Sequence, residues 1–150
     1  MRIPTRSLLF AAAALAAAAP AQAQISVNRT VDFELEKWFE IEERDGPVTL
    51  HRIRLEREGG GLRSRIQGAN EFQVPIKVSL EYTNNSSKDW KAQFHVVWMD
   101  AAGEPIDGYV GSSDIDEEKK YERAGGTVTT LKYGLSRARK IRIVVDAKPD

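Results

Sequence analysis

The sequence predicts an all-β protein built as a sandwich of antiparallel strands. Apolar residues occupy every second position in three stretches of the chain, which is the period of a strand with one buried face. Clusters of turn-forming residues follow two of these stretches, as expected for a meander. A sheet with one apolar face needs a second layer to cover it, and together these observations predict a two-layered β-protein.

The three alternating stretches cover residues 72–82, 90–99 and 140–145. The turn clusters lie at residues 84–89 and 100–105, and the second combines glycine with a proline that cannot donate to a ladder. Pro75 predicts a sheet edge or a bulge at the start of the first stretch. The residues expected to face inward are Phe72, Val74, Ile76, Val78, Leu80, Tyr82, Trp90, Ala92, Phe94, Val96, Trp98, Ile141, Ile143 and Val145.

The N-terminal half is predicted to supply the second layer. Residues 31–41 alternate with one interruption at Lys37, Asp45-Gly46-Pro47 turns the chain, and residues 48–58 return. Acidic residues accompany the outgoing stretch and arginines the returning one, so we expect cross-strand ion pairs on a solvated face, each contributing roughly 0.2–1 kcal/mol. These charged residues are Asp32, Glu34, Glu36, Glu40, Glu42, Arg52, Arg54, Arg57, Arg63 and Arg65.

Residues 113–123 are the one stretch with helical signals. Acidic residues lead, basic residues trail, and Gly125-Gly126 would end a helix. Because Ile115 is the only aliphatic anchor, we expect a short exposed helix or an ordered loop. The N-cap candidates are Ser112 and Ser113, and the trailing basic residues are Lys119, Lys120 and Arg123.

Residues 1–23 have the pattern of a cleaved secretory signal peptide. Arg2 and Arg6 precede an apolar run of twelve residues from Leu8 to Ala19, and Ala21-Gln22-Ala23 matches a cleavage site. A membrane-spanning helix needs about 20 residues, which disfavours the alternative of a retained anchor. We therefore expect one soluble domain over residues 24–150, with a net charge of −2 once Arg2 and Arg6 are removed, and no transmembrane segment. Export without disulfides favours the periplasm of a Gram-negative bacterium, with an extracellular location as the second choice.

The composition excludes several kinds of chemistry. Without cysteine the chain has no disulfide scaffold, thiolate zinc site or cysteine nucleophile, and without a basic excess it does not resemble a nucleic-acid binder. His51 and His95 lack further ligands at metal-like spacing and are expected to be surface strand residues. The acids at residues 114–118 lack the glycine and terminal glutamate of a calcium loop. We expect no catalytic residue, metal or cofactor, although paired carboxylates of a hydrolase stay open because the fold sets their separation.

Trp38 is the strongest candidate for a binding residue. If Phe39 and Ile41 face the core, Trp38 lies on the opposite face among glutamates, with Arg52 and Arg54 on the returning stretch. Tryptophan and arginine are enriched at binding hot spots, so we predict a partner-binding site at Trp38, Arg52 and Arg54. Two alternatives are that a bulge near Lys37 buries Trp38 and that a loop covers it.

The segment from Leu80 to Ile106 resembles small immunoglobulin-like envelope modules of the FxLYD type and, more closely, the YcfL-like periplasmic proteins. The residues that carry the resemblance, which extends over about residues 72–145, are Asn84, Ser86, Phe94, Trp98, Asp100 and Gly103. It implies an immunoglobulin-like β-sandwich in the cell envelope without enzymatic activity. The chain departs from the YcfL-like group, whose members are typically lipoproteins, in having no cysteine to carry a lipid.

These observations lead to three functional expectations. The first is a non-catalytic periplasmic module that binds another envelope protein, by strand addition at a sheet edge or through the face that carries Trp38. The alternative is a carbohydrate- or peptidoglycan-binding module in which outward aromatic residues stack on sugars. The third is a hydrolase with paired carboxylates.

Overall fold

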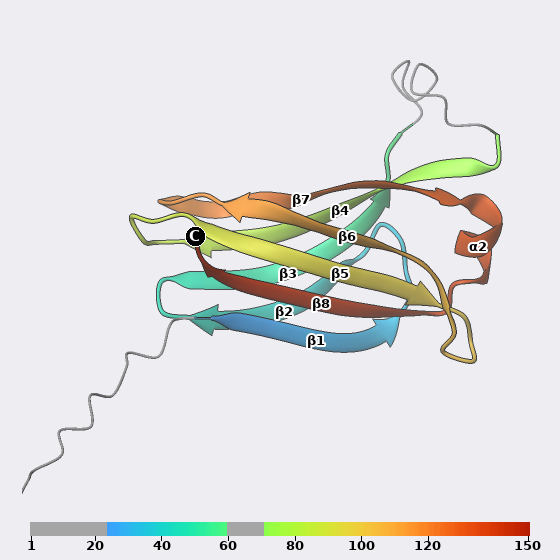
Figure 1. The fold of residues 1–150 in the computed structure, drawn as a ribbon, viewed down its shortest axis with the longest axis horizontal. Helices are drawn as coiled ribbons and strands as arrows, with labels where there is room; N and C mark the ends of the chain where they lie inside the picture. The colour runs from blue at the N-terminus through green and yellow to red at the C-terminus, as the bar shows by residue number, and fades with distance from the viewer. Residues whose placement is uncertain (1–23, 60–70) are drawn as a thin grey trace, which may run out of the picture.

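The computed structural model describes residues 24–59 and 71–150, which form eight strands and one short helix (Figure 1). The expected signal peptide, residues 1–23, and Arg63 and Arg65 lie outside the described residues. The strands are β1 (Ile25–Asp32), β2 (Trp38–Asp45), β3 (Val48–Arg57), β4 (Gln73–Asn84), β5 (Trp90–Met99), β6 (Pro105–Ile115), β7 (Lys119–Leu131) and β8 (Lys140–Pro149). The helix is α2 (Lys132–Arg137).

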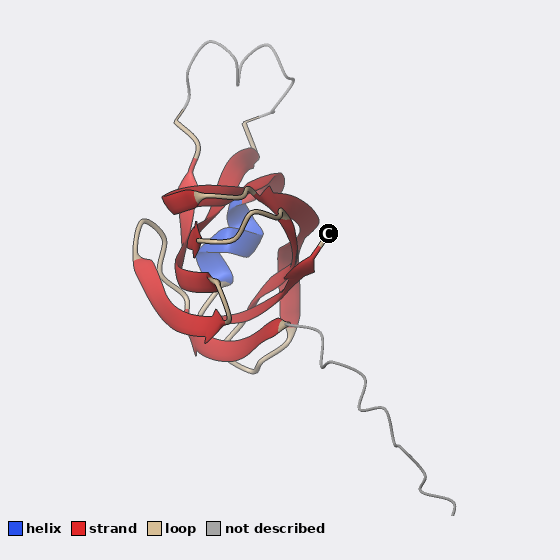
Figure 2. Cartoon of the chain, turned by 90° about the vertical axis from the view of Figure 1, so that its left-hand side faces the viewer, coloured by secondary structure: helices blue, strands red, loops and turns tan. Residues whose placement is uncertain are grey.

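The strands form two antiparallel four-stranded sheets, which confirms the predicted all-β sandwich. One sheet has the order β1-β8-β5-β6 and the other β2-β3-β4-β7. Seen along the strands, the two sheets surround the core, and α2 lies across one end (Figure 2). Leu135 in α2 and Ala138 just after it are buried, so the helix covers that end of the core with apolar side chains.

The neighbours of the central strands are those of an immunoglobulin-type sandwich. β4 lies beside β7, as strand B lies beside E, and β5 lies between β6 and β8, as strand C lies between C′ and F. The N-terminal strand β1 occupies the position next to β8 where strand G lies in that fold. The chain therefore completes this sheet with its first strand rather than its last.

The core is formed mainly by the alternating apolar residues of β3, β4, β5 and β8, and the other strands and α2 add further buried residues. Every residue predicted to face inward in β5 and β8 is buried, as are Ile76, Val78, Leu80 and Tyr82 in β4. The exceptions are Val74, which is half-buried, and Phe72, which precedes β4 and is 66% exposed because the inward alternation begins only inside the strand. Pro75 lies one residue beyond the last β3–β4 pair, Arg57 with Ile76, so its missing N–H falls where that ladder ends.

Residues 31–41 do not form one continuous strand, in contrast to the prediction. The chain leaves β1 at Asp32, crosses to the other sheet, and enters β2 at Trp38. Two backbone hydrogen bonds hold the crossing segment, from Phe33 N to the Arg139 carbonyl and from Glu36 N to the Leu55 carbonyl. The alternation persists through the crossing because Phe33 and Leu35 still pack against the core.

The helix expected near residues 113–123 is wrong, because this segment ends β6, turns and begins β7. Residues of β4 and of the β4–β5 turn bind the backbone of this turn. Asp116 N donates to Tyr82 Oη, Glu117 N to Asp89 Oδ1, and Glu118 N to the Ser86 carbonyl. The glycine pair that was expected to end a helix instead lies within β7. Gly125 has φ +142°, and a Cβ there would lie 2.0 Å from the Val78 carbonyl oxygen, so glycine permits β7 to approach β4.

Asn84 joins the β4–β5 turn to the end of β6. Its side-chain amide donates to the carbonyls of Lys88 and Ile115, and its oxygen accepts from the backbone N–H and hydroxyl of Ser86. The residue is fully buried, so water cannot replace these partners.

Replacing Asn84 by alanine should lower the free energy of unfolding by about 2–4 kcal/mol, because four hydrogen bonds are lost and buried groups are left without partners. Urea denaturation of residues 24–150 measures the change. Asn85→Ala, at the adjacent exposed position, is the matched control and should change the value by no more than about 0.5 kcal/mol. Equal effects of the two substitutions would contradict the role assigned to Asn84.

Candidate functional site

The outer face of the β2-β3-β4-β7 sheet carries Trp38 together with three arginines. The strand register aligns Trp38 with Arg54, and aligns Arg52 with Glu81 and then Arg123 on β7. We call Trp38, Arg52, Arg54 and Arg123 the arginine–tryptophan cluster. The register thus assembles one surface feature from strands β2, β3 and β7.

All three guanidinium groups lie within cation–π distance of the Trp38 ring. The guanidinium carbons of Arg52, Arg123 and Arg54 are 4.6, 5.2 and 5.8 Å from the ring centroid. Within about 6 Å a cation is attracted to the negative face of the indole. Ser79, the small residue in register with Arg54 on β4, is almost fully buried.

Phe39 and Ile41 pack on the core side of β2, and Trp38 lies on the opposite face, half-buried by its neighbours on the sheet. The bulge expected near Lys37 is not at that position. The register shift of β2 falls between Glu40 and Glu43, after Trp38, where Glu42 adopts a φ of +49°. The bulge therefore leaves the orientation of Trp38 unchanged.

Glu81 fixes the position of Arg52. This carboxylate is only 7% exposed, and it accepts two hydrogen bonds from Arg52, at 2.9 Å from Nε and 3.2 Å from Nη2. The hydrogen bond with Glu81 raises the pKa of Arg52, and the nearby charges of Glu81, Glu40 and Glu42 act in the same direction. A two-point contact of this kind holds the guanidinium in one plane beside the indole.

Arg54 is held by Glu36, the residue at the crossing between β1 and β2. Arg54 Nη2 donates to Glu36 Oε2 at 3.0 Å, and the backbone N–H of Arg57 donates to Glu36 Oε1 at 2.9 Å. The Arg57 N–H first, and Arg54 second, lower the pKa of Glu36 below its usual value. Arg54 Nε also lies 3.3 Å from Glu56 Oε2.

Cross-strand ion pairs are present as expected, but only some of them join the expected partners. Arg52 pairs with Glu81 on β4 rather than with an acid of the outgoing strand. Arg54 pairs with Glu36 in the crossing segment, and His51 Nδ1 lies 3.4 Å from Glu42 Oε1 on β2. The prediction included Arg52, Arg54 and Glu36 but missed Glu81, because it assumed that the two N-terminal strands face only each other.

Arg123 is the member of the cluster that sequence reasoning missed. It was assigned to a helix, whereas β7 places its side chain on the sheet face. Within the described part of the chain Arg123 is exposed, and its side chain takes part in no ion pair or hydrogen bond. Arg123 is thus a cation beside Trp38 that the fold does not neutralise.

The two histidines lie in different surroundings. His51 is half-buried: its Nε2 lies 2.8 Å from Thr83 Oγ1, and its ring stacks on Tyr121 with 4.8 Å between centroids. His95 is exposed on β5, as expected of a surface strand residue. Across residues 24–59 and 71–150, no three histidine or acidic side chains gather as a metal site would require. Glu81 is the only buried acid in those ranges, and its partner is Arg52 rather than a second carboxyl.

The chain matches no protein-family model and no curated protein sequence. Among the residues that the structure describes, no helix has the length and apolar character to cross a membrane. A function for the arginine–tryptophan cluster must therefore be argued from its own geometry and charge.

Replacing Glu36 by glutamine should destabilise the protein near neutral pH but not in acid. A carboxyl whose pKa is lowered on folding stabilises the fold above its unfolded pKa, and this contribution is lost as the pH falls through the lower, folded pKa. The variant and the wild type should therefore converge in unfolding free energy below about pH 4.

Urea denaturation at neutral and acidic pH measures this convergence. Glu34→Gln is the matched control, because Glu34 pairs only with Lys37 through half-exposed side chains. A deficit of Glu36→Gln that stays the same at every pH would assign the effect to packing rather than to charge.

Proposed function

We propose that the chain is a non-catalytic, exported β-sandwich that binds another protein of the cell envelope through the arginine–tryptophan cluster. The single observation that carries this proposal is a half-buried, outward tryptophan in contact with three arginines on an open sheet face. Tryptophan and arginine are the residues most often found at binding hot spots. Because Glu81 and Glu36 already hold two of the arginines, the surface loses little conformational freedom on binding.

The charge of Arg123 favours a partner with an acidic side chain at the contact. Arg52 and Arg54 have glutamate partners within the domain, whereas Arg123 has none among the described residues. A carboxylate from the partner would pair with Arg123, and an apolar neighbour of that carboxylate would cover the exposed part of Trp38. We therefore expect an acidic residue next to an apolar one on the partner.

Contact through the side-chain face is favoured over strand addition at β2. β2 is an edge strand of its sheet, but Arg29 on β1 donates to the carbonyls of Glu40 and Ile41 at 3.1 and 2.9 Å. A side chain that binds edge carbonyls blocks the pairing that an added strand would need. The cluster lies on the face of the sheet, where Arg29 does not interfere.

A glycan ligand is the second candidate, and Tyr121 is the observation that favours it. This tyrosine on β7 is 69% exposed and stacks on His51, so the same sheet presents a second aromatic ring near the cluster. Sugars stack on such rings, and peptidoglycan fragments are the glycan that a periplasmic protein meets. The binding experiment below separates the two candidates.

Substitution of Trp38 by serine should abolish capture of the partner. Immobilised residues 24–150 would be exposed to a Gram-negative envelope extract supplemented with peptidoglycan fragments, and any captured protein would then be purified and titrated. We expect Trp38→Ser and Arg123→Ser each to weaken binding by at least about tenfold, the scale of a hot-spot truncation.

Tyr133→Ser is the matched control for this experiment. Tyr133 is an exposed aromatic with Arg137 5.7 Å from its ring, yet it lies on α2 at the end of the sandwich. If all three variants weaken binding of the partner equally, the arginine–tryptophan cluster is not the contact site. Capture of peptidoglycan fragments alone would replace the protein partner with a glycan.

The exported location rests on residues 1–23 and has its own test. Expression of the full chain in a Gram-negative host should yield a periplasmic protein that begins at Gln24, as intact mass and N-terminal sequencing would show. Ala23→Leu, which removes the small residue before the cut, should accumulate the uncleaved precursor. A cytoplasmic protein that retains Met1 would contradict the proposal.

A further inference from the structure

The outer face of the β1-β8-β5-β6 sheet carries a central apolar patch. The register aligns Asn28, Val144, His95 and Val110 in one row across the four strands, and Val97 lies in the next row. We call Val97, Val110 and Val144 the valine patch. Val110 is 75% exposed, more than any other large hydrophobic side chain that the structure describes, and Val97 and Val144 are half-buried.

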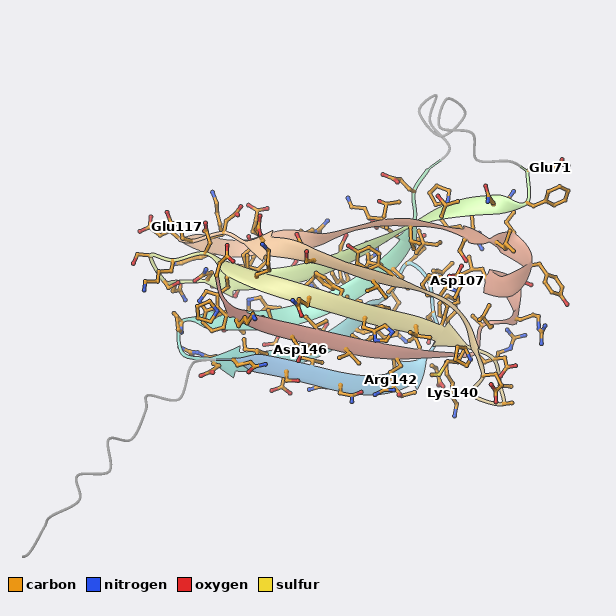
Figure 3. The ribbon with its side chains drawn as sticks, in the orientation of Figure 1. Glu71, Asp107, Glu117, Lys140, Arg142 and Asp146 are labelled. Carbon is orange, nitrogen blue, oxygen red and sulfur yellow. The ribbon has the colours of Figure 1, made fainter. Side chains whose placement is uncertain are left out.

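Two opposite charges flank this patch along β8. Arg142 lies two residues before Val144 and Asp146 two residues after it, so each is about 7 Å from the central row. Figure 3 shows Asp146, Arg142 and Lys140 in succession along the strand. Within the described part of the chain neither Arg142 nor Asp146 forms an ion pair; their hydrogen bonds run sideways to Asn28 and Ser26 of β1.

This arrangement is complementary to itself. A two-fold axis along the central row would place a second copy face to face with the first, with its strands reversed. Arg142 of each copy would then lie opposite Asp146 of the other, forming two symmetric ion pairs around the valine patch. We propose that this face is the interface of a homodimer.

A hollow beside Asp146 has room for the arginine of the second copy. Its volume is about 170 Å³, and it is lined by Gln24, Gln93, Asp146, Ala147 and Lys148. The lining is mostly polar: Gln93 is in register with Asp146 on the neighbouring strand, and Lys148 is the one cation among the lining residues. A guanidinium that enters it meets both a charge partner and hydrogen-bond acceptors.

The size of the face fits a weak dimer. Four strands about 4.8 Å apart and about 33 Å long cover roughly 600 Å² on each copy, or about 1,200 Å² in total. That is the lower end of the range for specific protein interfaces, which indicates a dimer that dissociates at low concentration.

Lys140 and Lys148 do not oppose the pairing. They are exposed residues near the two ends of β8. If the strands of the two copies were exactly aligned, Lys140 of one copy would lie opposite Lys148 of the other. Twisted sheets, however, pack with their strands crossed by about 30°. About 13 Å from the axis this crossing separates the facing lysines by more than one strand spacing. Arg142 and Asp146, about 7 Å from the axis, are displaced by only about 4 Å, which the long arginine side chain can span.

Exchange of the two charges on β8 tests the proposal directly. Sedimentation velocity of residues 24–150 over a range of micromolar concentrations should show a reversible dimer that weakens with added salt. Arg142→Asp or Asp146→Arg alone places like charges opposite each other at both pairs, and each should weaken dimerisation at least about tenfold. The double variant restores both pairs with reversed polarity and should return the dissociation constant to within about threefold of the wild type.

Lys77→Asp is the matched control, because Lys77 is an exposed charge in the middle of the other sheet and should leave dimerisation unchanged. Near-UV circular dichroism verifies that each variant folds. A wild type that stays monomeric at the highest concentration would overturn the proposal. So would a double variant as weak as the single ones. Neither result bears on the arginine–tryptophan cluster, which lies on the opposite sheet.

Discussion

The ion pair between Arg52 and Glu81 is the interaction on which the candidate site depends. Glu81 lies on the central strand β4 and is almost buried, and a carboxylate in such a place is costly without a hydrogen-bonded cation. Arg52 supplies that cation through two hydrogen bonds, and its fixed guanidinium becomes a support for Trp38. The requirement to neutralise one buried charge thus orients the aromatic residue proposed to bind a partner.

The two outer faces of the sandwich differ in how their charged side chains are paired. On the β2-β3-β4-β7 sheet Arg52 and Arg54 are paired with glutamates within the domain, and the Trp38 ring lies against them. On the β1-β8-β5-β6 sheet Arg142 and Asp146 are hydrogen-bonded only to neutral side chains of β1, and the centre is aliphatic. A surface with separated, unneutralised charges of both signs suits a copy of itself. A surface with an unpaired cation beside an aromatic ring suits a different, acidic partner.

Local sequence patterns predict most of the strands, but they do not predict where the chain passes from one sheet to the other. The alternation of β5 and β8 and the outward position of Trp38 could be predicted, because strand period and turn residues act over a few positions. The crossing at residues 33–37 could not, since Phe33 and Leu35 face the same core from either sheet. The expected helix failed for a similar reason. The Asp116 backbone N–H donates to the distant Tyr82 hydroxyl instead of to a helical cap, and Gly125 allows the close approach of β7 to β4 instead of ending a helix.

Arg123 is the member of the arginine–tryptophan cluster whose presence folding does not explain. Arg52 and Arg54 stabilise carboxylates that the fold brings to them, so their presence has a structural explanation. Arg123 is exposed and has no such partner among the described residues, and an exposed cation–π contact contributes only about 0.5–1 kcal/mol. Stability alone therefore gives little reason for a third arginine beside Trp38. A ligand that brings its own negative charge would give that reason, because the cation is already held next to the ring where the ligand must dock.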